Sequence, residues 1–264
     1  MSGSFEFLNL VSSNILPFLM VVTRLGTIFF TIPPFRNHNI PNIVKVLVTL
    51  AITVIVFPII AIKIDIRQIS YFQVFYFLAI EFLVGIIISF VISIIFIAAQ
   101  FAGSLIDFNS GFGFASVVDP LTQENVTLTS KFYFLMTMTL FFTIGGHNLM
   151  VKGVVESYRI LPLATFKLNI ESIKFLMKSF SSIFSIGFKI AAPVFASLFL
   201  AEIALAILAR AIPQLNVFLI GFSLKISVLF IVLAITLVNT VPYLQGLFED
   251  SFLNLENFLK IFAV

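Results

Sequence analysis

Long apolar segments alternate with shorter polar stretches along most of the chain. Six segments are nearly free of charge, at 15–32, 46–62, 72–102, 132–144, 183–209 and 217–241. A helix needs about 20 apolar residues to cross a ~30 Å hydrocarbon core, and the third, fifth and sixth segments reach that length. The apolar runs are continuous and not alternating, which favours helices over barrel strands. We therefore predict an all-α integral membrane protein.

One connection stands out between these segments. The stretch 103–130 contains several glycines, Thr and Asn residues and the pair Asp119-Pro120. These residue types favour turns and loops, so we expect a long non-helical connection here. Connections of this length inside a compact fold are usually functional or disordered.

Two further features concern the second half of the chain. Arg210, Pro213 and Gln214 lie in a short polar stretch between the last two apolar segments, which predicts a tight corner and a helical hairpin. The stretch 170–184 is amphipathic, which predicts an interfacial or partner-docking helix. Its apolar positions are Ile173, Leu176, Met177, Phe180 and Phe184, and its opposite face carries Lys174 and Lys178.

Composition strengthens the membrane prediction and excludes several functions. Only 10% of residues are charged and 60% are hydrophobic, including 35 Phe, whereas a soluble domain has about 25% charged residues. The net charge of +3 is spread along the chain without a basic stripe, so we expect no nucleic-acid binding. With no cysteine, no metal-binding spacing around the two His and no nucleophile or phosphate-loop motif, we expect no cofactor, no metal and no enzymatic activity.

Charged residues inside apolar segments are costly and therefore informative. The two short-stemmed acids, Glu81 and Glu202, cannot easily reach a membrane surface, which favours pairing with cations on other helices. The cations either join such pairs, line a polar passage or extend to an interface. The complete set of intramembrane polar or packing candidates is Arg24, Glu81, Lys189, Glu202, Arg210 and Lys225.

The long connection could act as a seal. Gly111 and Gly113 free its backbone, and Phe108, Phe112 and Phe114 are large and apolar. An apolar, movable segment beside a pore can exclude water. An ordinary buried connector is the alternative on this evidence.

Three separated motifs stand out, namely the stretch 111–120 (GFGFASVVDP), the trio Gly146-His147-Asn148, and the stretch 209–222 (ARAIPQLNVFLIGF). Together they resemble the motifs of the FliR family of flagellar type III secretion export-gate subunits, which is related to injectisome SctT-type subunits. Their order and the segment layout agree over residues 10–250. One position departs from the pattern, because Ser223 stands where the family commonly has Pro.

The resemblance implies a fold and a set of site residues. It implies one domain over 1–264, with a FliP-like part at about 1–182 and a FliQ-like C-terminal helical hairpin at about 183–264. It also implies that 110–126 plugs the resting channel, through Ser110, Gly111, Phe112, Gly113, Phe114, Asp119 and Pro120. The signature turn would comprise Pro213, Gln214, Asn216 and Gly221.

The resemblance further implies partners and a location. The partners would be FliP-like and FliQ-like subunits, an FlhB-like switch protein, an FlhA-like export component, unfolded flagellar substrates and membrane lipid. The chain would lie in the bacterial inner membrane, as a multi-pass protein of the flagellar basal body. The alternatives are a virulence injectisome export-gate subunit and, from another class, a small-solute transporter.

Overall fold

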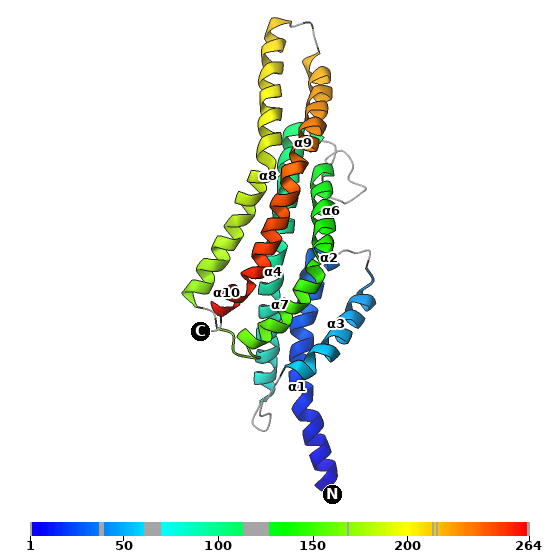
Figure 1. Ribbon diagram of the computed structural model, residues 1–264, viewed down its shortest axis with the longest axis vertical. Coiled ribbons are helices and arrows are strands. Elements are labelled where there is room, and N and C mark those ends of the chain that lie inside the picture. Colours follow the sequence, from blue (N-terminus) through cyan, green and yellow to red (C-terminus); the bar gives the residue numbers. More distant parts are fainter. Residues whose placement is uncertain are drawn as a thin grey trace. The chain divides into compact units, whose positions relative to one another are not determined.

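The computed structural model describes residues 2–36, 40–60, 70–112, 127–167, 169–212, 214 and 216–262. These residues form helices, with no strand among them (Figure 1). In chain order the elements are α1 (Ser2–Thr31), α2 (Pro33–Arg36), α3 (Asn42–Val56), η1 (Phe57–Ile59), α4 (Tyr71–Ser110), α6 (Leu128–Thr143), α7 (Gly146–Ile160), α8 (Ile170–Ala211), α9 (Val217–Leu253) and α10 (Leu255–Lys260). The all-α prediction is confirmed.

Several of these helices can cross a membrane. Within the described ranges, four stretches are long and apolar enough, namely Asn42–Ile59, Tyr71–Ser110, Ile170–Ala211 and Leu219–Leu253. The pair α6 and α7 adds a fifth if it is counted as one broken span. Exposure of such long apolar helices to water is unfavourable, whereas lipid accommodates them. The chain is therefore an all-α integral membrane protein.

Two predicted boundaries are wrong. Helix α4 continues to Ser110 and α6 begins at Leu128, so both ends of the predicted non-helical stretch 103–130 are helical. Gly103 lies inside α4, where it permits close packing on the start of α6, since a Cβ at this position would overlap the backbone of Ser130. The second wrong boundary lies in α8. This continuous helix joins the amphipathic stretch 170–184 to the apolar segment 183–209 and contains Pro193.

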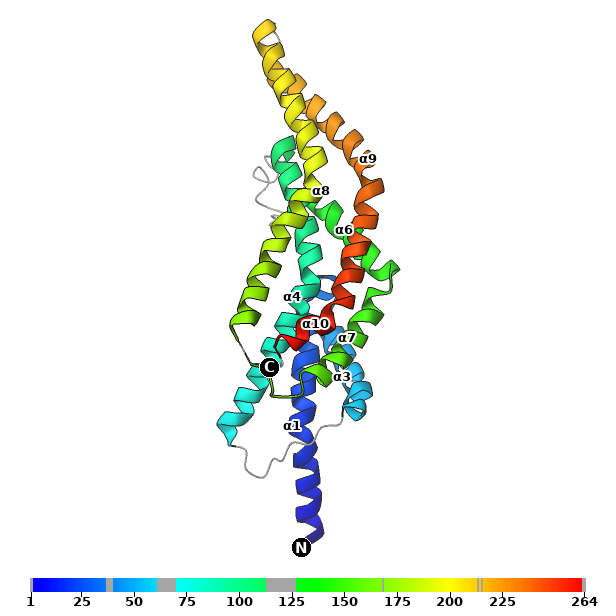
Figure 2. The ribbon, with the colours of Figure 1, turned by 60° about the vertical axis from the view of Figure 1, so that its left-hand side comes forward.

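The chain divides into two compact units, each built from separate stretches of sequence. Unit 1 comprises Met1–Ser93, Gly146–Leu176 and Asp250–Val264, and unit 2 comprises Ile94–Gly145 and Met177–Glu249. In unit 1, α3 lies beside α1 in both views (Figures 1 and 2). The buried side of α1 carries Val21, Leu25 and Ile28 at helical spacing.

Unit 2 has an aromatic core. Phe96 of α4, Phe141 of α6 and Phe248 of α9 are completely buried. Their ring centroids lie 5.5 to 5.7 Å apart in edge-on or tilted pairs, which is a favourable aromatic geometry. In the same unit α8 and α9 run antiparallel in both views (Figures 1 and 2), so the predicted helical hairpin is confirmed.

The chain does not bury the apolar face of the amphipathic stretch. Met177, Phe180 and Phe184 are half or more exposed, while a different stripe of α8, including Ser179, Ile183 and Gly187, is buried. A covering of lipid or of another subunit is therefore needed for the exposed stripe.

Candidate functional site: the two ends of the glycine and phenylalanine loop

The described part of the predicted plug lies in unit 2, where α4 ends. Ser110 is the last residue of α4 and is fully buried. Gly111 has a φ of +94°, a left-handed conformation that glycine adopts without steric cost. Its N–H still donates to the carbonyl of Asp107, at 3.2 Å. Gly111 therefore lets the chain leave the helix at this point. Gly113, Phe114, Asp119 and Pro120 lie outside the described residues.

Phe112 packs on helix α9. Its ring lies 6.4 Å from the ring of Phe222 and 6.5 Å from the ring of Phe230, in T-shaped geometry. Gly111 lies against the same Phe222 ring, since a Cβ at this position would be 3.6 Å from it. The first residues after α4 are thus held by an aromatic contact with α9.

The other end of the loop is held by Asp107, which sequence reasoning missed. This carboxylate is fully buried on α4. Its Oδ2 accepts the backbone N–H of Thr129 at 2.8 Å and that of Ser130 at 3.2 Å, and its Oδ1 accepts the Thr129 hydroxyl. Thr127, the N-cap residue of α6, makes no side-chain capping bond, so Asp107 caps α6 in its place.

A second charged contact lies where α4 ends. Nζ of Lys225 on α9 donates to Oε1 of Glu202 on α8 at 3.1 Å and to the carbonyl oxygen of Asn109 at 3.5 Å. The side chain of Lys225 is 18% exposed and that of Glu202 is 54% exposed. Lys225 therefore joins the α8–α9 hairpin to the last turn of α4.

A second ion pair, Arg24 with Glu81, lies in unit 1 and is buried. Arg24 Nε donates to Glu81 Oε2 at 2.6 Å, and the two side chains are 1% and 0% exposed. The guanidinium also donates to the Ser157 hydroxyl and the Leu161 carbonyl, each at 3.2 Å, and lies 4.1 Å from the centroid of the Tyr158 ring. Protein groups accept four hydrogen bonds from this guanidinium, so we interpret the pair as structural.

The remaining candidates lie apart from these clusters. Lys189 and Arg210 are exposed on α8. Asn216 directly precedes α9, and its carbonyl accepts the N–H groups of Leu219 and Ile220 in the first turn of that helix. Gly221 is buried against Leu205 of α8, where a Cβ would lie 3.2 Å from a Leu205 methyl. Gln214 is an exposed turn residue, and Pro213 lies outside the described residues.

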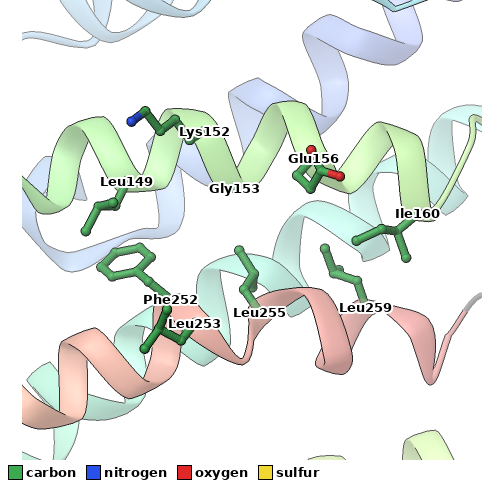
Figure 3. Close-up of a pocket in the computed structure, with 9 residues that line it drawn as sticks. All are labelled: Leu149, Lys152, Gly153, Glu156, Ile160, Phe252, Leu253, Leu255 and Leu259. Carbon is green, nitrogen blue, oxygen red and sulfur yellow. The ribbon is translucent and has the colours of Figure 1, made fainter.

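Unit 1 also contains a cavity of about 330 Å³ between α7 and the chain around α10. Figure 3 shows Leu149 facing Phe252, and Leu255 and Leu259 pointing toward α7. Lys152 and Glu156 are its charged lining residues, and Glu156 pairs with Arg159 at 3.2 Å. Across the described part of the chain, no three His, Cys, Asp or Glu side chains are placed to hold a metal ion.

The family model described as bacterial export proteins, family 1, matches residues 15–251. The chain belongs to this family. The match therefore includes α4, residues 113–126, α8 and nearly all of α9.

Three relatives of this export family show how far the similarity extends. The chain is 33% identical to the flagellar biosynthetic protein FliR of Bacillus subtilis, over 94% of this chain and 96% of that protein. It is 29% identical to FliR of Escherichia coli, over 87% of each. It is 31% identical to the Yop proteins translocation protein T of Yersinia pestis, over 59% of this chain and 60% of that one.

Proposed function

We propose that this chain is a structural and gating subunit of the flagellar type III protein-export channel in the bacterial inner membrane. It would act within a complex of FliP-like, FliQ-like, FlhB-like and FlhA-like proteins and pass unfolded flagellar subunits, without enzymatic activity. The near full-length similarity to two flagellar proteins supports the flagellar system. The shorter match to the Yersinia translocation protein favours an injectisome subunit as second candidate.

We propose further that 110–126 plugs the closed channel. The observation that carries this proposal is the anchoring of both loop ends in unit 2, by Phe112 on α9 and by Asp107 on α6. A plug must be held at its ends while its middle can move aside for a passing chain. Apolar side chains in the passage exclude water and ions, whereas polar ones would let them through.

Replacing 110–126 by a Gly/Ser linker of equal length tests the plug. The linker keeps the chain connected but removes the aromatic side chains, so we expect cells to become permeable to small ions and solutes. The measurement is solute uptake in intact cells. Co-purification of the replaced chain with FliP-like and FliQ-like subunits is the control for assembly. An assembled complex with normal permeability would contradict the plug role.

A further inference from the structure

One polar stripe of α3 contacts α1. A Cβ at Gly26 of α1 would lie 3.7 Å from the Thr49 methyl group, and Nζ of Lys45 lies 5.8 Å from the centroid of the Phe30 ring. The two helices therefore run antiparallel, with the end of α1 beside the start of α3. The buried residues of α3 lie three or four positions apart on one face of the helix. They are Lys45, Thr49, Thr53 and Val56.

The rest of α3 is apolar and exposed. Ile43, Leu47, Val54 and Ile55 are 60% to 67% exposed. Helix α3 and η1 together form the 18-residue membrane-capable stretch Asn42–Ile59, which is about 27 Å long at the rise of an α-helix. That length only just matches a ~30 Å hydrocarbon core. In a bilayer the first turn of α3 would therefore lie near the lipid headgroups, with its exposed face toward the acyl chains.

Lys45 is a buried cation in this first turn without a hydrogen-bond acceptor. It is 8% exposed, and among the described residues no carboxylate or carbonyl group accepts a hydrogen bond from its ammonium group. The Phe30 ring provides a cation–π contact, which offsets only part of the cost of removing a charge from water. Buried lysines are normally paired. The ammonium group of Lys45 therefore still requires an anion.

The neighbouring sequence does not supply that anion. Residues 7–64 contain no Asp or Glu but four Lys or Arg residues. One of these cations, Arg24, already has a partner in Glu81 of α4. The charge that remains around the start of α3 is therefore positive, and it is complementary to an anion from outside the chain.

The amino end of α3 adds further donors at the same place. Pro41 is the N-cap residue and makes no side-chain capping bond, so the N–H groups of Asn42 and Ile43 have no acceptor within the helix. The helix dipole makes this end partly positive, and the side chain of Lys45 leans toward it, as helical side chains do. An ammonium group beside free backbone donors fits the oxygens of a phosphate group.

We propose that the start of α3 binds the phosphate group of an anionic phospholipid, with Lys45 as the principal contact. The phosphate supplies the negative charge that Lys45 and the amino end of α3 lack. The acyl chains of the same molecule cover Ile43 and Leu47, which lie within two positions of Lys45 and are exposed. This site is independent of the proposed export function.

Two observations favour an anionic lipid over other phosphates. A free phosphate ion would satisfy the charge but leave the apolar face of α3 uncovered. A zwitterionic headgroup also carries a cation, and residues 7–64 offer no carboxylate to receive it. An anionic phospholipid satisfies the charge and covers the apolar face together.

Photoreactive lipids test this site. The full chain, purified with its accompanying subunits, is placed in phosphatidylcholine nanodiscs that contain phosphatidylglycerol with a photoreactive acyl chain. A parallel sample contains photoreactive phosphatidylcholine instead. We expect phosphatidylglycerol to label peptides of α3 several-fold more than phosphatidylcholine does, because Lys45 holds the anionic headgroup. Mass spectrometry of the labelled peptides measures this.

Variants assign the lipid preference to Lys45. We expect Lys45→Met to reduce the phosphatidylglycerol labelling of α3 to the phosphatidylcholine level, and Lys45→Arg to retain it. Lys189→Met is the matched control and should change nothing, because Lys189 is an exposed cation on another membrane-capable helix, α8. Equal labelling by both lipids in the native chain would reject the headgroup site. No labelling of α3 by either lipid would mean that a protein subunit covers this helix, and would overturn the proposal.

Discussion

At the scale of single residues, Arg24 shows what a charge inside an apolar helix requires. Its guanidinium donates to Glu81 of α4 and to Ser157 and the Leu161 carbonyl at the end of α7. The second oxygen of Glu81 accepts the N–H of Ala164, at 3.1 Å. Removing two charges from water is costly, and these hydrogen bonds offset that cost. The pair therefore ties α1, α4 and the connection after α7 together.

We expect the loss of one partner of this ion pair to destabilise the protein more than the loss of both partners. Arg24→Met or Glu81→Leu leaves one buried charge without its partner, so each should lower the free energy of unfolding by about 3–5 kcal/mol. The double variant should lose less than the two single losses added together. Chemical unfolding in detergent, followed by circular dichroism, measures this. Arg159→Ala is the control, because the Arg159–Glu156 pair is exposed and should contribute little. A stable Arg24→Met protein would contradict the argument.

At the scale of elements, close helix contacts depend on small residues. A Cβ at Gly187 of α8 would lie 2.6 Å from the Phe101 ring and 2.8 Å from the Ala98 carbonyl oxygen, both on α4. A Cβ at Gly85 would lie 2.9 Å from the carbonyl oxygen of Arg24. Backbone atoms cannot move aside as a flexible side chain can. These glycines therefore set the spacing between helices.

Glycine substitutions test this spacing. Gly187→Ala should lower the free energy of unfolding by about 1–3 kcal/mol, because the added methyl group is overpacked against α4. Gly246→Ala on α9 is the matched control, since nothing lies within 4 Å of its Cβ position. It should be neutral or stabilising by up to about 1 kcal/mol, the difference in helix propensity. Thermal melts followed by circular dichroism distinguish the two, and equal melts would refute the role of Gly187.

The elements themselves were largely predictable, but their ends were not. Hydropathy located the apolar runs that became α3, α4, α8 and α9. It did not show that α4 extends through Gly103 to Ser110, because a local pattern cannot distinguish a glycine that ends a helix from one that permits close packing on another helix, as Gly103 does on α6. Nor did it show that α8 begins at Ile170, since a helix can continue from a polar into an apolar stretch when its backbone bonding is unbroken.

At the scale of the whole molecule, the surface indicates that the chain works inside a larger assembly or in lipid. Met177, Phe180 and Phe184 form an exposed apolar stripe on α8. A neighbouring exposed stripe contains Lys178 and Ser185. We therefore expect the apolar stripe to face lipid or another subunit and the polar stripe to face water.

A charge placed on each stripe tests these surroundings. Phe184→Asp should sharply reduce recovery of the chain in the detergent-solubilised complex, because a carboxylate cannot be accommodated against lipid or an apolar subunit face. Ser185→Asp, one residue away, should leave recovery near the native amount. Equal recovery of the two variants would mean that the Phe184 face is in water.

The sequence by itself determined that this protein is helical and lies in a membrane, because hydropathy summed over a short window decides whether a segment can cross lipid. Its motifs also pointed to the export family that the comparison confirms. Only the tertiary structure decided that Glu81 meets Arg24, 57 positions away, and that Asp107 caps α6, 22 positions away. Such contacts depend on how separate helices pack, and a local pattern carries no information about which distant backbone group will face a given side chain.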